Sequence, residues 1–307
     1  MKVHLGFHSW PFSKGRVVAS LGNYDGVHVG HQAILKRVVK AAREFSVPTV
    51  AVTFDPVPRK VLAPQAAPPL IQTLGQRLRK LESLDLDHTI VVAFDQQFAK
   101  KSPEDFVREY LVDTLGIRCF VVGEHFSFGH QKRGNIELLR EMGRQYDFSV
   151  EAITEVRAGE RRVSSTLVRE CILTGDMEAA NTYLGSPFSL EGTIVEGEKL
   201  GARLGIPTAN LNPENEIQPA NGVYVTQVSV ESQLYGSVTN VGIRPTVGGK
   251  KWTVESHLFQ FSGDLYGKKI ELQFLKRIRE EIRFASVDDL KSQIHKDIQV
   301  ARRYLSL

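Results

Sequence analysis

Residues 21–31 read Leu-Gly-Asn-Tyr-Asp-Gly-Val-His-Val-Gly-His and stand between two regular patterns. An apolar run over Val17–Leu21 predicts a strand, and apolar residues spaced three and four apart over Ala33–Phe45 predict a helix. Three glycines let the connecting backbone turn tightly and approach a ligand. Free N–H groups at a helix start favour an anion, so we interpret this strand–loop–helix stretch as a phosphate-binding loop.

Two histidines, His28 and His31, come together at the start of the expected helix. Imidazoles at this place are suited to stabilise charge that develops on phosphate oxygens during nucleotidyl transfer. Histidines three residues apart also occur as ordinary surface residues or as half of a metal site. No third and fourth ligand follow at the usual spacing, and the glycine-rich setting favours the phosphate role.

The first half of the chain alternates strand and helix patterns. Further strands are expected at 47–54, 89–94 and 119–123, and further helices at 76–84, from Ser102 onward and at 134–146. Five prolines between Pro56 and Pro69 predict a long loop without regular structure. Strands that alternate with helices indicate an α/β fold, in which helices cover both faces of a parallel sheet.

The second half changes character after Ser186. Strand patterns follow one another without helices between them, at 192–195, 222–230, 234–241, 253–261 and 269–275. A capping-box pattern at Ser286 then opens one terminal helix. This order predicts a small closed β-barrel with a terminal helix, and it places the two domains at residues 1–186 and 187–307.

Composition and charge exclude several classes of protein. The chain has 307 residues with a net charge of +4, which divides into +3 for residues 1–186 and +1 for the rest. Neither half is basic enough to indicate a nucleic-acid-binding domain, and no apolar run is long enough for a membrane span. No signal peptide is visible, and Cys119 and Cys171 lie in apolar surroundings that indicate buried thiols. We therefore expect a cytoplasmic protein without membrane or nucleic-acid partners; its oligomeric state stays open.

A second polar segment, Val163–Arg169, reads Val-Ser-Ser-Thr-Leu-Val-Arg. Hydroxyl groups at a helix start are ordinary N-caps, and that interpretation is sufficient for the segment taken alone. Arg169 lies one turn beyond Ser165, however, so its guanidinium and the hydroxyls of Ser165 and Thr166 can face the same polyphosphate.

Together these two segments resemble the N-terminal module of the bacterial bifunctional riboflavin kinase/FAD synthetases, within the HxGH nucleotidylyltransferase superfamily. The resemblance covers essentially the whole chain. Residues 201–211, Gly-Ala-Arg-Leu-Gly-Ile-Pro-Thr-Ala-Asn-Leu, match the riboflavin kinase signature, which is highly specific. Other matching segments follow at the expected places, at residues 53–56, 121–123, 128–129, 221–224, 240–246, 254–257 and 263–267.

For the second half, the resemblance implies a six-stranded antiparallel β-barrel that phosphorylates riboflavin to FMN. Thr208 and Asn210 would hold Mg²⁺, and Thr208 also the ATP phosphates. Glu255 would act as the general base on the ribityl hydroxyl, because a primary alcohol is a poor nucleophile. Arg279 matches a segment near the flavin.

For the first half, the resemblance implies a Rossmann-like domain that transfers AMP from ATP to FMN, giving FAD and pyrophosphate. His28 and His31 would contact the phosphates at the reacting centre. Asn23, Asp25 and Gly26 would line the ATP loop, Ser165, Thr166 and Arg169 would bind the outer phosphates, and His125 would lie at the flavin.

Three positions of the first half depart from the usual family pattern. Val57 stands where members often have His, His125 where they have Asp or Asn, and Asn135 where they often have Asp. An imidazole offers one donor and one acceptor, whereas a carboxylate only accepts and attracts Mg²⁺. The departures leave an alternative open, a riboflavin kinase whose first half only binds nucleotide or flavin. A nucleic-acid-binding regulator with a borrowed fold would need a segregated basic surface, which the sequence lacks.

Overall fold

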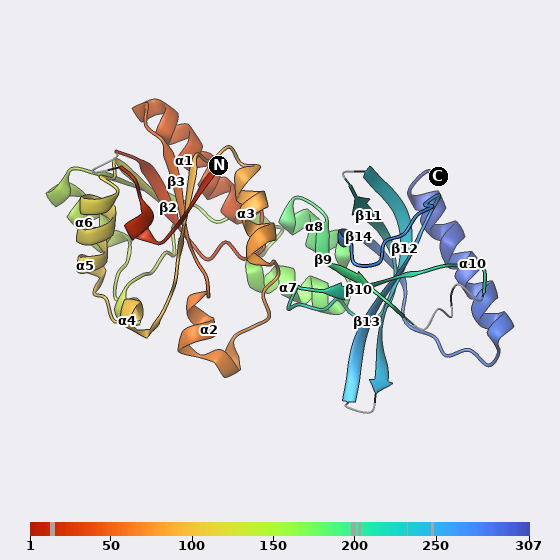
Figure 1. The fold of residues 1–307 in the computed structure, drawn as a ribbon. Coiled ribbons are helices and arrows are strands. Elements are labelled where there is room, and N and C mark those ends of the chain that lie inside the picture. The colour runs from red at the N-terminus through yellow and green to blue at the C-terminus, as the bar shows by residue number, and fades with distance from the viewer. Residues whose placement is uncertain (13–15, 198–200, 202–203, 232, 247–248) are drawn as a thin grey trace. The chain divides into compact units, whose positions relative to one another are not determined.

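The computed structural model describes the chain except for residues 13–15, 198–200, 202–203, 232 and 247–248, and the side chains of 244–251 are not described. Ala202 and Arg203 of the kinase signature therefore lie outside the described residues. The chain forms two compact units, one made of Met1–Pro69 and Leu74–Ser164 and the other of Leu70–Thr73 and Ser165–Leu307 (Figure 1). Each unit is described by itself.

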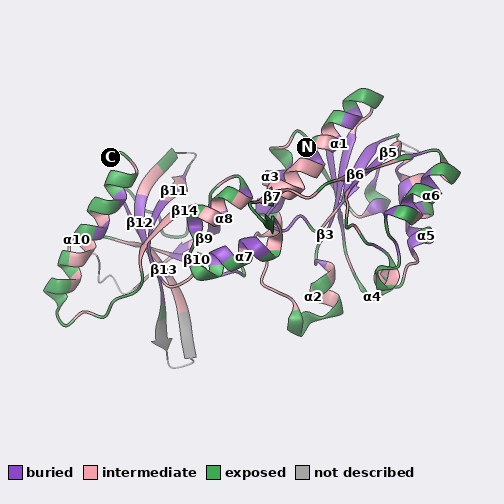
Figure 2. Ribbon diagram, turned by 180° about the vertical axis from the view of Figure 1, so that it is seen from behind, coloured by how far each residue is buried: buried purple, intermediate pink, exposed green. Residues whose placement is uncertain are grey.

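The first unit is built on a six-stranded parallel sheet with the strand order β1-β4-β3-β2-β5-β6. Its strands are β1 (Lys2–Leu5), β2 (Val18–Leu21), β3 (Thr49–Phe54), β4 (His88–Val92), β5 (Cys119–Gly123) and β6 (Ser149–Ile153). Neighbouring residues of β2 point to opposite faces, Val18 into a cluster with α1 and Ala19 into a cluster with η3 and α6. The α/β sheet with helices on both faces is confirmed, and Figure 2 shows the buried strands at its centre.

Short and long helices connect these strands. The elements of the first unit outside the sheet are η1 (Phe7–Ser9), α1 (Val29–Phe45), α2 (Pro58–Leu62), η2 (Pro64–Ala66), α3 (Leu74–Glu82), α4 (Gln96–Ala99), α5 (Pro103–Phe106), η3 (Val107–Thr114), η4 (His130–Lys132), α6 (Ile136–Tyr146), β7 (Arg157–Ala158) and β8 (Arg161–Arg162). The prediction of a structureless loop over Pro56–Pro69 is wrong, because α2 and η2 lie within it. Pro58 and Pro64 each stand in the first turn of a helix, where the missing N–H has no intrahelical partner to lose.

The second unit is a closed barrel with the strand order β10-β13-β12-β11-β14-β9, in which each neighbouring pair is antiparallel. Its strands are β9 (Phe188–Val195), β10 (Ala209–Pro213), β11 (Gly222–Val230), β12 (Gln233–Thr246), β13 (Gly249–Leu258) and β14 (Lys269–Arg279). Among its described residues, the helices are α7 (Ser165–Thr174), α8 (Met177–Leu184) and α10 (Val287–Tyr304). The predicted barrel with a terminal helix is confirmed.

The core of the second unit includes residues from outside the barrel. Apolar side chains of α7 and α8 belong to the same cluster as the barrel interior, and so does Ile71, which is fully buried. The Leu70 N–H donates to Glu216 at 2.9 Å, and Asn215 Nδ2 donates to the Ile71 carbonyl at 3.2 Å. Residues 70–73 and 165–186 therefore pack with the second unit, although they precede Ser186 in the sequence. The assignment of one activity to residues 1–186 and another to residues 187–307 stays a prediction.

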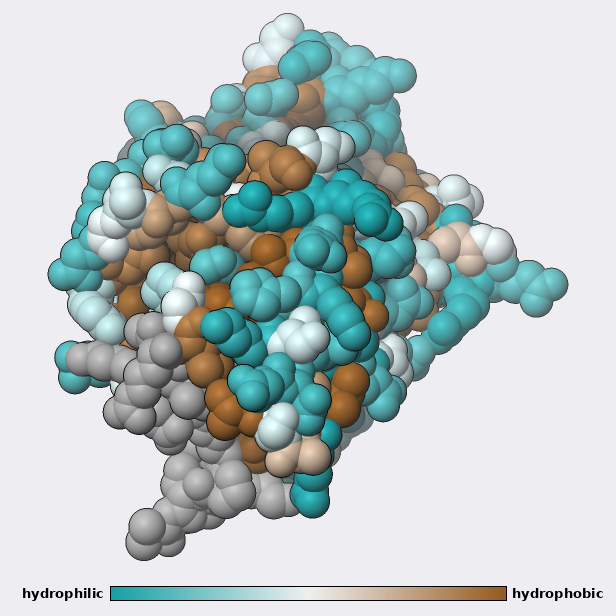
Figure 3. Space-filling model, turned by 90° about the vertical axis from the view of Figure 1, so that its right-hand side faces the viewer, coloured by the Kyte–Doolittle hydropathy of each residue, from teal (hydrophilic) through white to brown (hydrophobic). Residues whose placement is uncertain are grey.

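The outer surface of the second unit is mostly hydrophilic on the side that carries α10, with hydrophobic residues scattered over it (Figure 3). Exposed apolar residues on α10 include Val287 and Val300. None of the helices in the described part of the chain combines the length and the apolar character that a membrane crossing needs.

Candidate functional sites

The loop between β2 and α1 places His28 at the N-terminus of the helix. His28 is the N-cap residue, and its Nδ1 accepts a hydrogen bond from the His31 N–H at 3.3 Å. The loop backbone has positive φ values at Tyr24 (49°), Gly26 (85°) and Val27 (39°). A β-branched residue such as valine rarely adopts a positive φ, so this loop carries the backbone strain that is common at ligand sites.

The imidazole rings of His28 and His31 stack with 3.7 Å between their centroids and 19° between their planes. Burial and the neighbouring His28 lower the pKa of His31 well below its usual 6.5, so His31 is neutral at pH 7. Its Nδ1 atom is buried without a hydrogen-bond partner among the described residues. Because an unpaired buried polar atom costs free energy, this nitrogen is suited to bind a ligand.

Tyr24 holds His31 from within the loop. The two rings meet edge to face with 5.4 Å between their centroids, and the Tyr24 hydroxyl donates to Ser20 Oγ at 2.9 Å. Burial raises the pKa of this phenol above its ordinary value, so it stays protonated. A Cβ atom on Gly22 would come within 2.8 Å of the Tyr24 ring, which explains the glycine at this position.

The remaining predicted residues of the loop differ in exposure. The Asn23 side chain is exposed, whereas Gly26 is buried and Asp25 is only 4% exposed. Burial lowers the pKa of the Arg77 guanidinium, and the nearby carboxylates of Asp55 and Asp25 oppose that shift. Arg77 is not predictable as a buried residue from the sequence, because a charged residue in a helical pattern normally lies on the surface.

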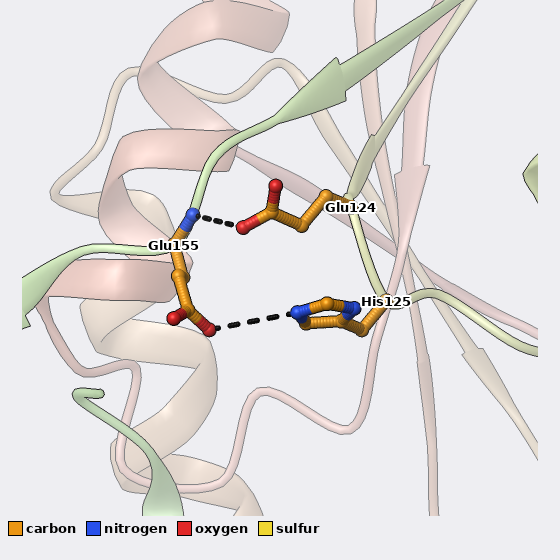
Figure 4. Close-up of side chains that lie close together, drawn as sticks. All are labelled: Glu124, His125 and Glu155. Carbon is orange, nitrogen blue, oxygen red and sulfur yellow. Dashed lines mark hydrogen bonds and ion pairs between the residues drawn. The ribbon is translucent and has the colours of Figure 1, made fainter. Parts of the chain in front are cut away.

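Glu124, His125 and Glu155 form a polar cluster after the ends of β5 and β6 (Figure 4). His125 is exposed, and its Nε2 lies 3.7 Å from Glu155 Oε2. Glu124 Oε1 accepts the Glu155 N–H at 2.9 Å, and Glu155 also pairs with Arg157 at 2.6 Å and with Arg162 at 3.3 Å.

One ligand atom from each of Glu124, His125 and Glu155 lies within 4.8 Å of the others, so these residues could hold a divalent cation. The two arginines already neutralise Glu155, however. The contacts of the cluster therefore explain how the segment after β6 is fastened to the segment after β5, without any ion.

The two other departures from the family pattern have structural roles. Asn135 is the N-cap of α6, and its Oδ1 accepts the Leu138 N–H at 2.9 Å. Val57 is 5% exposed and so contributes to the apolar interior. Of the three departures, Val57 is buried, whereas Asn135 and His125 are exposed.

Ser165, Thr166 and Arg169 lie in the first turns of α7, within the second unit. Ser165 and Arg169 are four residues apart and share one side of the helix, and both are half-buried, whereas Thr166 is exposed. This agrees with the predicted spacing. Their binding of the outer phosphates stays a prediction.

In the second unit, the strand register brings Asn210 of β10 and Glu255 of β13 side by side. Asn240 of β12 lies on the other side of Glu255. Val254 and Ser256, the neighbours of Glu255, are buried, and Val254 packs in the barrel interior. Because side chains alternate along a strand, Glu255 and the two asparagines lie on the outer face of the barrel. Sequence reasoning missed Asn240, although the residue stands within a matching family segment.

The segment before β10 is held close to this outer face. His257 of β13 and the carbonyl oxygen of Pro207 are hydrogen-bonded at 2.8 Å through Nδ1. A Cβ on Gly201 would lie 3.2 Å from Thr208 Oγ1, and a Cβ on Gly197 would collide with the amide of Asn210. The glycines therefore let the backbone come close to the two oxygen-bearing side chains.

This oxygen-rich group has the chemistry that a magnesium ion requires. Mg²⁺ prefers hydroxyl, amide and carboxylate oxygens, which Thr208, Asn210 and Glu255 supply, and it usually completes its shell with substrate phosphates. The backbone at Gly197 and Gly201 approaches the side chains of Asn210 and Thr208 closely, which only glycine allows.

Arg279 is engaged with the terminal helix. Its Nε and Nη2 atoms donate to the Asp297 carboxylate at 3.1 and 2.8 Å, and Asp297 is 3% exposed. This two-pronged ion pair ties β14 to α10. The ion pair gives Arg279 a structural role. Its contact with the flavin stays a prediction.

Comparisons with known proteins match both halves of the chain. The family model for FAD synthetase matches residues 11–167, and the model for riboflavin kinase matches residues 184–305. The bifunctional riboflavin kinase/FMN adenylyltransferase of Pseudomonas fluorescens is 38% identical, over 98% of this chain and 97% of that protein. The protein of the same name from Haemophilus influenzae is 35% identical, over 94% of each chain.

A solved structure with the same architecture is described as a macrolide-efflux protein from Streptococcus pneumoniae. It superposes with a TM-score of 0.89 at 31% sequence identity and covers 98% of both chains. The sequence similarity to the curated relatives extends over both units and includes both candidate sites. On this evidence the chain belongs to the family of bifunctional riboflavin kinase/FMN adenylyltransferases.

Proposed function

We propose that this protein phosphorylates riboflavin to FMN with ATP, and then transfers AMP from a second ATP to FMN, giving FAD and pyrophosphate. The observation that carries the proposal is that each family match coincides with its own polar site. His28 and His31 lie within the FAD synthetase match, and Asn210 and Glu255 lie within the riboflavin kinase match.

In the kinase reaction, the oxygen of the terminal ribityl hydroxyl attacks the γ-phosphorus of ATP, and ADP leaves. Glu255 accepts the proton of that hydroxyl. Thr208 and Asn210 would hold Mg²⁺, which neutralises charge on the phosphates when it is bound. The position of Glu255 between two asparagines supports this role, because their amide groups can orient the carboxylate and the substrate.

In the adenylyl transfer, a phosphate oxygen of FMN attacks the α-phosphorus of ATP, and the bond to the leaving pyrophosphate breaks. The attacking group is already an anion, so no base and no covalent intermediate are needed. Neutral His31 and the N-terminal N–H groups of α1 would donate hydrogen bonds to the phosphate oxygens as charge develops. Ser165, Thr166 and Arg169 would bind the pyrophosphate part.

A product assay tests both activities at once. The purified chain receives riboflavin, ATP and Mg²⁺, and chromatography separates FMN from FAD over time. We expect FMN first and FAD later. If products stop at FMN across several metals and flavin redox states, the proposed adenylyl transfer is wrong, and the chain is a kinase with a binding module.

Two substitutions assign the sites. Glu255→Gln should abolish FMN formation and leave the conversion of added FMN to FAD intact, with exposed Glu231→Gln as the control in the same unit. His28→Ala should do the reverse, with exposed His8→Ala as its control. Loss of both activities in either variant would contradict two independent sites.

The alternative, a kinase whose first half only binds nucleotide or flavin, is less well supported. Of the residues that motivated it, Val57 is buried and Asn135 caps α6, whereas His125 is exposed, with its Nε2 3.7 Å from Glu155. The histidine pair and the strained loop after β2, which the adenylyl transfer needs, are both in place.

A further inference from the structure

Arg77 of α3 is a buried cation that bridges the loop after β2 and the end of β3. It is 3% exposed, and its Nη1 donates to the Asn23 carbonyl at 2.8 Å while its Nη2 donates to the Phe54 carbonyl at 2.9 Å. Asn23 belongs to the loop that leads to His28, and Phe54 is the last residue of β3. One guanidinium therefore connects the ends of two neighbouring parallel strands.

Packing alone does not explain why an arginine stands at position 77. A buried guanidinium is costly unless it is paired, and an apolar residue of similar size would fill the space at lower cost. The only carboxylate within ion-pair distance among the described residues is Asp55, at 3.8 Å, and the Nε atom has no hydrogen-bond partner. This arrangement stabilises backbone carbonyl positions more than it stabilises the charge.

The loop that Arg77 holds needs an external support. Tyr24 and Val27 have positive φ values, and such a conformation persists only where its surroundings enforce it. The Asn23 carbonyl accepts a second hydrogen bond, from Thr53 Oγ1 at 3.2 Å. Arg77 and Thr53 thus fix the loop at the residue just before its strained part.

We propose that Arg77 is a positioning residue for FMN adenylylation, which holds the His28 loop and the end of β3 in register so that the phosphates of ATP meet His28 and His31. The proposal rests on the proposed function of the first unit. Arg77 acts through the two backbone carbonyls, and it touches no reacting atom.

The test compares Arg77→Met, Arg77→Lys and Thr53→Val with the parent protein, and it measures FAD formation from FMN and FMN formation from riboflavin in each preparation. Arg77→Met removes both donors, and we expect kcat for FAD formation to fall by about ten- to a hundredfold, since a shift of about 1 Å at a reacting centre has that effect. Arg77→Lys keeps the charge but cannot reach both carbonyls, and should lie in between. Thr53→Val should cause a smaller fall.

Riboflavin kinase activity should stay within about twofold of the parent value in all three variants, as should both activities of Arg140→Met, an exposed arginine of α6. The fall should appear mainly in kcat, with an unchanged midpoint for the thermal loss of FAD formation, whereas a loosened first unit would lower that midpoint. If Arg77→Met forms FAD within twofold of the parent rate, the proposal is overturned.

Two further outcomes are decisive. If Arg77→Met does not fold, Arg77→Lys and Thr53→Val decide the question, because unchanged kcat for FAD formation in both would refute the positioning role. If the parent protein itself makes no FAD, the proposed function of the first unit is wrong. If the parent makes FAD and the variants are equally active, only the positioning role of Arg77 is wrong.

Discussion

Ile71 lies in the first part of the sequence, yet its side chain is fully buried in the core of the second unit. Ile71→Ala removes three carbon atoms from a closely packed site and leaves a cavity. Such a change costs about 2 to 4 kcal/mol of unfolding free energy. For a unit of this size, each kcal/mol lowers the unfolding midpoint by roughly 2 to 4 °C, so we expect the second unit to unfold about 5 to 15 °C earlier.

The assay follows the two activities separately. The protein is heated briefly at a series of temperatures and cooled, and the remaining riboflavin kinase and FMN adenylyltransferase activities are measured in each sample. We expect Ile71→Ala to lower the midpoint for loss of kinase activity. Leu139→Ala, a fully buried position of α6 in the first unit, serves as the matched control and should lower the midpoint for loss of FAD formation instead.

The reasoning is refuted if Ile71→Ala leaves the kinase midpoint unchanged, or if it lowers the adenylyltransferase midpoint and spares the kinase. Either result would mean that Ile71 packs with the unit to which most of its sequence neighbours belong. The backbone contacts of residues 70–73, through Asn215 and Glu216, are unchanged by the substitution. The experiment therefore reports on the Ile71 side chain alone.

Three further predictions follow from single contacts. His31 stays neutral in the folded protein, whereas in the unfolded chain it takes up a proton near pH 6.5, so the free energy of unfolding of the first unit should decrease as the pH falls below about 6.5. Urea unfolding at several pH values should show a smaller decrease for His31→Gln. Asp297→Asn leaves Arg279 without its carboxylate and should destabilise the second unit by about 3 kcal/mol, with an unchanged KM for riboflavin if the pair is purely structural. Asn135→Ala removes the N-cap of α6 and should cost about 1 kcal/mol by thermal unfolding, while kinase activity at 25 °C stays the same.

The sequence was sufficient for the overall architecture because that architecture depends on local patterns. Alternating strands and helices predict a parallel sheet wherever they occur, and successive strands without helices predict a barrel. The stretch Pro56–Pro69 was misread because proline ends a helix in its interior but begins one in its first turn. Strand β6 was missed because most of its residues are half-buried and lack a clear apolar run.

The candidate sites were predictable where their residues are close in the sequence. His28 and His31 are three residues apart, and a glycine-rich loop marks them. By contrast, Glu255 and Asn210 are brought together by strand register, which no local pattern of this chain reveals. Arg77 is even harder to predict from the sequence, because its burial and its two carbonyl partners depend on how α3 packs beside the strand ends.

The two sites differ in how much support they need from elsewhere in the chain. On the barrel, Glu255 and its asparagine neighbours lie on regular, hydrogen-bonded strands, whose geometry is enforced by the ladder itself. In the first unit, His28 follows a loop with positive φ at Val27, and the loop keeps this shape only through contacts such as those of Arg77. Strain of this kind makes a site sensitive to substitutions that do not touch the ligand. Random substitutions in the interior of this protein should therefore impair FAD formation more often than FMN formation, even where both units remain folded.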